Sequence, residues 1–227
     1  MRRALVLFAL LLAGSSFAQD AGVRPRFAVL YFDAPPGDAE LVDFSKGFAS
    51  MLISDFAANE QLQVIERERL EDVMSELKLG ETRFADKKSF AKVGEVLGAQ
   101  YLLVGMLLRD KAKKQIYVNA RLVAPNTTNT WAWGKIAVAE GEVVAGEEEL
   151  VKKATAKLLE IGVLPRASSE PPKKAFKLSG ETFQKYSKAL QAKDKKDKGT
   201  ATKLLGEVVK EQPDFKVAQL DLLSLTK

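Results

Sequence analysis

Apolar and polar positions in the first part of the chain follow two patterns, one typical of buried strands and one of helices. Residues 26–33 form a continuous apolar run rich in β-forming residues, which predicts a strand buried on both faces. A turn at 34–38, rich in proline and glycine, ends it. From Glu40 to near Asn59, large apolar residues recur every three or four positions, which predicts a helix with one buried face. Those residues are Leu41, Phe44, Phe48, Leu52 and Phe56.

The following segments repeat the order of strand and helix. Residues 62–65 predict a short strand, and the apolar spacing within 70–77 predicts a second helix. A loop is expected at 79–85. Asp86 is a candidate N-cap for a third helix, and Gly98 stands where that helix would end.

Three strands and a helix are predicted next. Residues 101–108 are apolar throughout, whereas 116–122 alternate apolar and polar side chains, which indicates a strand covered on one face only. A turn at 125–129 and the segment 130–138 predict an antiparallel return strand. A helix at 147–162 follows. This order of elements predicts an α/β or α+β fold, with helices flanking a mixed β-sheet.

A stretch rich in proline and serine separates this predicted domain, residues 24–163, from the C-terminal part of the chain. It covers residues 164–176 and fits neither pattern, so we interpret it as a linker. Residues 177–227 are expected to form a second, small, all-helical domain. Its predicted helices cover 179–193, 200–212 and 215–225.

The N-terminus has the three parts of a secretory signal peptide, residues 1–18. Basic residues come first, an apolar run at 4–13 follows, and a small-residue cleavage site ends at Ala18. The apolar run is too short to span a bilayer, and the mature chain is expected to contain no transmembrane segment. Ser15 stands where a lipidated cysteine would have to be, so we expect no lipid anchor. The expected location is the periplasm, with peripheral attachment to the outer membrane as an alternative.

The composition excludes much of enzyme chemistry. The chain has no His and no Cys, so a nucleophile activated by imidazole, a His-ligated zinc and a thiolate site are all excluded. The formal net charge of +5 is far weaker than a dedicated nucleic-acid-binding protein would carry, and we expect no nucleic-acid partner. We therefore expect a protein that is not an enzyme, with no catalytic residues, no metal and no cofactor.

Acidic residues are the remaining candidates for catalysis. Asp33, Glu66, Glu68 and Asp72 could serve a carboxylate-based hydrolase or a divalent-metal site, but nothing in the sequence fixes their separation. The alternating charges at 66–69 are more simply interpreted as solvated pairs at the start of a helix.

Two tryptophans form a second candidate site. Trp131 and Trp133 alternate along one predicted strand and so share a face, with Tyr117 and Arg121 as candidate cross-strand neighbours. They could form a platform that binds a glycan or a partner, or they could pack under a helix.

The order and spacing of several short segments resemble the CsgG family of envelope proteins and, more loosely, the related TolB amino-terminal-like and FlgO-like domains. The resemblance covers residues 26–162, and its clearest segments are GFASML at 47–52, VIER at 64–67 and LGAQYLLVG at 97–105. It implies an extracytoplasmic assembly or scaffold domain without catalytic residues. Family members that form secretion channels carry a lipobox cysteine and long insertions for membrane hairpins. This chain has Ser15 and a short turn at 125–129 instead, so we do not expect it to be a pore.

Residues 186–213 resemble a single tetratricopeptide repeat. Tyr186, Ala189, Ala201 and Pro213 occupy positions of the motif, whereas Leu205 and Val208 depart from its usual residues. A generic helical hairpin is the alternative.

This region is also rich in lysine, with ten lysines against three acidic residues at 173–203. It could dock an anionic partner or form a solvated helical face. We name Tyr186, Lys185 and Lys188, together with Trp131 and Trp133, as candidate partner-binding residues.

The sequence thus predicts an accessory or scaffold protein for envelope assembly or secretion that acts through protein–protein interaction. Its expected partners are envelope or outer-membrane proteins, with self-association as a further expectation. A periplasmic module that binds glycan or cell-wall polymer is the alternative.

Overall fold

The computed structural model describes residues 24–35, 37–77, 87–127, 129–133, 135–139, 142–165, 174 and 176–226. The predicted signal peptide, the loop at 79–85, the Asp86 cap and most of the predicted linker lie outside these residues.

Helices and strands follow the predicted order closely. The structure has β1 (Arg26–Val29), α1 (Ala39–Ala57), β2 (Gln63–Val64), α2 (Arg67–Glu76), α3 (Lys87–Leu97), β3 (Tyr101–Asp110), β4 (Gln115–Ala124), β5 (Asn129–Ala132), β6 (Ile136–Ala139), α4 (Val143–Glu160), α5 (Gly180–Asp194), α6 (Lys198–Glu211) and α7 (Lys216–Leu225). Gly98 ends α3 with a positive φ of 62°, a conformation that glycine adopts without strain.

The strands form one mixed sheet, as predicted. Its order is β2-β1-β3-β4-β5, with β6 also paired to β4. The pairs β1–β2 and β1–β3 are parallel, and those of β4 with β3, β5 and β6 are antiparallel. The fold is therefore α+β, with helices flanking a mixed sheet and further helices at the C-terminus.

The predicted single return strand at 130–138 is wrong in one respect, because the chain forms two strands there. Arg121 pairs with Ala132, whereas Val118 pairs with Ile136. The register of the returning chain against β4 therefore differs by one residue between these two pairs, and β5 and β6 are separate strands.

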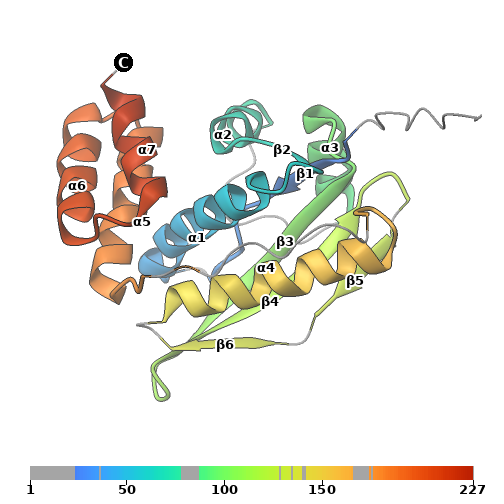
Figure 1. Cartoon of the computed structure of the whole chain (residues 1–227), viewed down its shortest axis with the longest axis horizontal. Helices are drawn as coiled ribbons and strands as arrows, with labels where there is room; N and C mark the ends of the chain where they lie inside the picture. The colour runs from blue at the N-terminus through green and yellow to red at the C-terminus, as the bar shows by residue number, and fades with distance from the viewer. Residues whose placement is uncertain are drawn as a thin grey trace, which may run out of the picture.

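The two faces of the sheet are covered differently. Helices α1 and α4 lie across one face, and β4 buries its apolar residues Ile116, Val118 and Leu122 there (Figure 1). Arg121 points to the other face, where its guanidinium lies 5.1 Å from the ring centroid of Phe90 on α3. The predicted alternation along this strand is confirmed.

Helix α5 packs directly on α1, so the C-terminal helices lie beside the sheet domain (Figure 1). The rings of Phe44 and Phe183 meet edge to face with centroids 4.7 Å apart. The Ser50 and Tyr186 hydroxyls are hydrogen-bonded at 2.8 Å. Gly47 allows this close approach, because a Cβ atom there would lie 2.9 Å from the ring of Phe183. We call this contact between α1 and α5 the junction.

Within the described residues, no helix combines the length and the apolar character needed to cross a membrane.

Candidate functional site

Tyr186 lies inside the junction and is fully buried. Its hydroxyl bonds Ser50 of α1 and donates to the Asp221 carboxylate of α7 at 2.8 Å. Burial raises the pKa of this phenol well above its ordinary value. The residue that was expected to bind a partner therefore binds α1 and α7 of its own chain, and it has no surface for a second protein in this structure.

The two candidate lysines of α5 differ in their surroundings. Lys185 forms ion pairs with Glu181, at 3.3 Å, and with Glu211. Lys188 is exposed, and no ion pair or hydrogen bond links its ammonium to another described residue. Lys188 is thus the one of the two that keeps its charge available to a ligand.

The tryptophans lie at the other end of the molecule from α5, on and just after β5 (Figure 1). Both indoles are half-buried and pack against the hydrophobic core. Trp131 stands opposite Leu122, on the face of the sheet that α1 and α4 cover, so Tyr117 and Arg121 are not its cross-strand neighbours as the sequence suggested. The five candidate partner-binding residues therefore do not form one site.

The candidate acidic residues are dispersed rather than gathered. Asp33 is buried beside the sheet, where its backbone bonds Gly105 and Leu107, whereas Glu66 and Asp72 are exposed. Among the described residues, no group of three or more acidic side chains could hold a metal ion.

The sequence predicted solvated charge pairs at residues 66–69, and this prediction is wrong for Arg67. Its side chain is only 5% exposed, and its Nη1 atom lies 2.6 Å from the Asp194 Oδ1 atom of α5. Lys46 of α1, 4% exposed, lies 2.8 Å from the other oxygen of Asp194 and 3.4 Å from Glu71 of α2. We call Lys46, Arg67, Glu71 and Asp194 the junction cluster.

A second buried group of charges holds the segment that leads into α5. The Lys174 ammonium lies 2.7 Å from Glu147 of α4 and 3.1 Å from Asp55 of α1. The Lys174 backbone N–H donates to Glu148 at 2.6 Å. We call these four residues the Lys174 clamp, because together they fasten this segment to the sheet domain.

Glu147 is the most perturbed acid of the clamp. It is 0% exposed, and its Oε1 atom has no hydrogen-bond partner among the described residues. Burial, together with the nearby Asp55 carboxylate, raises the pKa of Glu147 to about 8, against the opposing effect of Lys174. Two carboxyl groups approach one ammonium here, and the raised pKa means that Glu147 keeps its proton at neutral pH.

The Glu147→Gln variant is expected to flatten the pH dependence of stability. The unfolded chain loses this proton near pH 4.5 and the folded chain near pH 8, so the free energy of unfolding should fall as pH rises through this interval. One proton corresponds to a slope of at most about 1.4 kcal/mol per pH unit. Burial also raises the pKa of Glu71, so a smaller slope should remain.

Urea unfolding of the mature chain across this pH interval measures the slope. The chain has no histidine, so no imidazole obscures the comparison. Glu149→Gln is the matched control, because Glu149 is exposed on the same helix and, among the described residues, forms an ion pair only with Lys153. Equal slopes for the two variants would contradict this assignment of the proton.

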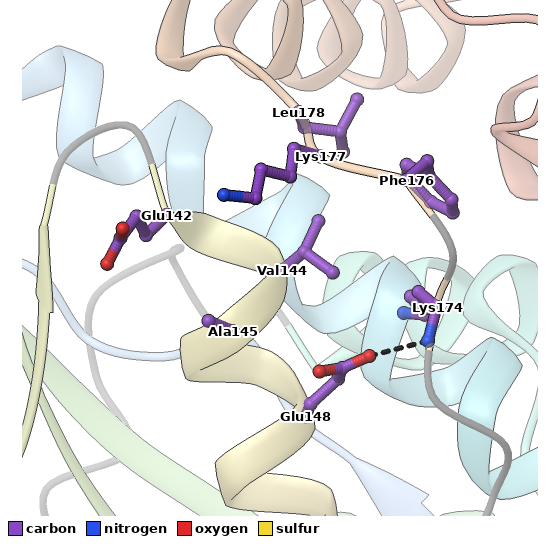
Figure 2. Close-up of a pocket in the computed structure, with 8 residues that line it drawn as sticks. All are labelled: Glu142, Val144, Ala145, Glu148, Lys174, Phe176, Lys177 and Leu178. Atoms are coloured by element: carbon purple, nitrogen blue, oxygen red, sulfur yellow. Dashed lines mark hydrogen bonds between the residues drawn. The ribbon is translucent and has the colours of Figure 1, made fainter.

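A hollow of about 200 Å³ lies beside the clamp (Figure 2). Val144 and Ala145 of α4 form one wall, and Phe176 and Leu178 of the segment before α5 form the other. Pockets that bind small molecules usually measure about 300–1,000 Å³. The hollow is therefore too small for a typical ligand.

A larger groove of about 400 Å³ lies where α5 passes the start of α1 and the end of β3. Its apolar floor is formed by Phe44 and Ile116, which are both buried. Its polar residues are Glu40, Arg109, Glu181, Gln184 and Lys188. This groove combines a ligand-sized volume with a few polar groups at its rim, the usual features of a binding site.

Sequence reasoning found Lys188 but missed most of the residues that join the two parts. Asp194 and Lys174 stand in lysine-rich or proline-rich stretches that are typical of solvated segments, and their partners are distant in the sequence. One signal in the sequence pointed to these contacts. Glu147 stands on the apolar stripe of a predicted helix, and a buried acid at such a position needs a hydrogen-bond or charge partner.

Comparison with known proteins identifies a relation over the first part of the chain. Residues 23–109 match the model of the family described as curli production assembly/transport component CsgG. The predicted resemblance is thereby confirmed for these residues. Its extension to residue 162 and the tetratricopeptide-like repeat stay predictions. No curated protein matches the chain.

Several solved structures are similar to part of this chain, at low sequence identity. The LpoB C-terminal domain from Escherichia coli is 17% identical with a TM-score of 0.38, over 52% of this chain and 86% of that one. Lipoprotein GNA1162 from Neisseria meningitidis is 12% identical with a TM-score of 0.40, over 60% of this chain and 99% of that one. TolB from Acinetobacter baumannii is 11% identical with a TM-score of 0.37, over 63% of this chain and 29% of that one.

Proposed function

We propose that this chain is a non-enzymatic accessory or scaffold protein of the bacterial cell envelope, located in the periplasm or peripherally at the outer membrane. The observation that carries the proposal is the match of residues 23–109 to a family described as an assembly/transport component. In this role the chain acts by binding other envelope proteins during assembly or secretion.

The junction supports this role physically. The buried aromatic contact, the hydroxyl pair and the junction cluster together join α5 to α1 and α2. Buried ion pairs require close geometry, so they favour one arrangement of the two parts. A partner that binds the C-terminal helices would then be held in a defined orientation to the sheet.

The outer face of α7 offers the surface for such a partner. Leu220 and Leu223 lie one turn apart and are 65% and 57% exposed, and Lys216 lies one turn before Leu220. Exposed apolar residues that adjoin one another are typical of protein-interaction sites. This surface fits the apolar face of an amphipathic segment of a partner protein.

Site-specific crosslinking in the living envelope tests the proposal. A photoreactive amino acid at position 220 of the full chain is expected to capture a defined envelope protein, whose purified form then binds the purified chain. Leu223→Asp should weaken that binding at least about tenfold, as expected for loss of a central apolar contact.

Met106→Asp is the matched control, because Met106 is the other exposed large apolar residue of the described structure and lies on the sheet. It should leave the binding unchanged. If purified envelope candidates bind the Leu223→Asp variant as well as the original chain, α7 is not the docking surface. If no envelope protein is captured at all, the proposed role is refuted.

The glycan-binding alternative rests on Trp131 and Trp133. Both indoles pack against the core, so their position is accounted for by stability. No observation favours the alternative over the protein-interaction role, and we do not propose it.

A further inference from the structure

The Lys174 clamp brings one amine and two carboxyl groups together, largely shielded from water. The Lys174 Nζ atom lies 2.7 Å from the Glu147 Oε2 atom and 3.1 Å from the Asp55 Oδ1 atom. Lys174 and Asp55 are 13% and 14% exposed, and Glu147 is fully buried. The three side chains come from the segment before α5, from α1 and from α4. An amine and a carboxyl group in this contact hold the atoms of an amide bond and one water molecule.

The contact between Lys174 and Asp55 favours a reaction between them. Reacting groups that a fold holds about 3–3.5 Å apart gain the large rate advantage of an intramolecular reaction. The Asp55 Cγ atom is bonded to the oxygen that Lys174 contacts, so this carbon is the electrophile within reach of the nitrogen. The Lys174 backbone N–H donates to Glu148 at 2.6 Å, which fixes the point from which the side chain extends. The side chain therefore needs little movement to attack.

Glu147 is placed to carry out the proton transfers that amide formation requires. The ammonium must lose a proton before its nitrogen can attack, and the departing carboxyl oxygen must gain protons to leave as water. A neutral carboxylic acid in contact with the same nitrogen can serve both steps. Burial raises the pKa of Glu147 to about 8, so this group is protonated at neutral pH. Its Oε1 atom accepts no hydrogen bond from a described residue, which leaves it available to the new amide N–H.

We propose that Lys174 and Asp55 form an intramolecular isopeptide bond, with Glu147 as the residue that transfers the protons. The Lys174 Nζ atom bonds to the Asp55 Cγ atom, and one C–O bond of that carboxyl group breaks. Two protons leave the ammonium, and both end on the departing oxygen, which is released as water. Glu147 donates its proton to this oxygen and takes one from the nitrogen, so it ends as it began. The reaction requires no oxidant, reductant or second protein.

Burial assigns different roles to the two carboxyl groups. Water must leave from the group that is attacked, and Asp55 is in contact with solvent whereas Glu147 has no exposed surface. The hollow of about 200 Å³ that Lys174 lines has room for a water molecule (Figure 2). Asp55 is therefore the attacked group, and Glu147 transfers the protons.

The junction cluster lacks this combination, although it also pairs a buried lysine with a carboxylate. Lys46 lies 2.8 Å from Asp194, but the Arg67 guanidinium lies 2.6 Å from the same carboxylate. Arginine is not deprotonated in proteins, so Asp194 faces a permanent positive charge and is the poorer electrophile. We therefore expect the bond at the clamp and none at the junction cluster.

The inference goes beyond the proposed function, because the bond lies within one chain and its detection involves no partner. Its failure would leave the α7 interaction untouched. The bond would keep the segment before α5 attached to α1 even in the unfolded chain, which restricts the unfolded state and so stabilises the fold.

Mass spectrometry of the mature chain, purified and then denatured, tests the proposal. The measured mass is expected to be lower than that of the sequence by one water molecule. The tryptic peptides that contain Asp55 and Lys174 should remain joined through these two residues. The full mass of the sequence would overturn the proposal, and so would a loss of water at any other place. A link from Lys174 to Glu147 would overturn the assignment of Asp55 as the attacked group.

Variants separate the three roles. Lys174→Arg keeps the positive charge without the amine, and Glu147→Gln removes the proton that is transferred, so both should have their full mass. Asp55→Asn should form the same bond with release of ammonia, whereas Asp55→Ala should form none. Lys177→Arg is the matched control, because Lys177 is an exposed lysine of the same segment, and this variant should keep the bond. A complete bond in Glu147→Gln would show that Glu147 does not transfer the protons. Because the mass of the original chain decides whether the bond exists, a variant that fails to fold leaves that result intact.

Discussion

Asp194→Ala is expected to lower the free energy of unfolding by about 3 kcal/mol. Removing one partner of a buried ion pair typically costs about 3–5 kcal/mol, because the other charge stays buried without compensation. Asp194 lies 2.6 Å from Arg67 and 2.8 Å from Lys46, so its loss affects two buried cations. Glu71 remains 3.4 Å from Lys46, and we therefore expect the lower end of the range.

Urea unfolding of the mature chain, followed by circular dichroism and by the fluorescence of Trp131 and Trp133, measures this loss. Because both tryptophans belong to the sheet domain, the comparison also shows whether α5 detaches before the sheet unfolds. Asp214→Ala removes an exposed aspartate on the same C-terminal part and should change stability by less than about 0.5 kcal/mol. A similar small effect for Asp194→Ala would show that the junction cluster contributes little to folding.

Gly47→Ala is expected to destabilise the junction by about 1–3 kcal/mol, although alanine is the better helix former. The added Cβ would lie 2.3 Å from the Ser187 Oγ atom and 2.9 Å from the Phe183 ring. Both residues are fully buried, and the Ser187 hydroxyl also bonds the Phe183 carbonyl oxygen. Helices α1 and α5 must therefore move apart or repack.

Gly206→Ala makes the same chemical change on α6, where a Cβ would meet no atom within 4 Å. Here the helix propensity of alanine acts alone, and a gain of about 0.5–1 kcal/mol is expected. The two variants should thus differ in sign when compared by urea unfolding. A stabilising effect of Gly47→Ala would mean that α1 and α5 do not approach as closely as the structure has them.

Periodicity predicted the secondary structure well because it reports burial directly. The apolar stripe of α1 and the alternation of β4 both follow from which side chains avoid water, and this is written locally in the chain. The strand predicted at 26–33 ends earlier, at Val29, and the one predicted at 130–138 is divided in two. The division goes with a change of register against β4, and the sequence of a single strand gives no signal of such a change.

The candidate site was predicted less well, for a different reason. Tyr186 was chosen as a binding residue because it stands at a motif position for a large side chain, yet it is buried against Ser50 and Asp221. A helix face that would be exposed in an isolated domain is buried when another part of the chain packs on it. The spacing of apolar residues along the helix is the same whether that face is exposed or buried, so the sequence does not distinguish the two.

By itself, the sequence determined the order of the elements, the mixed sheet with its flanking helices and the three C-terminal helices. It also carried the family resemblance, which the family match supports over residues 23–109. Each of these depends on spacing within short segments. Only the tertiary structure decided that Lys46 and Arg67 meet Asp194, that Glu147 shares Lys174 with Asp55, and that Gln184 and Lys188 line a groove. These groups belong to segments far apart in the chain, and the charge or hydrogen-bonding capacity of a residue does not specify which distant partner will satisfy it.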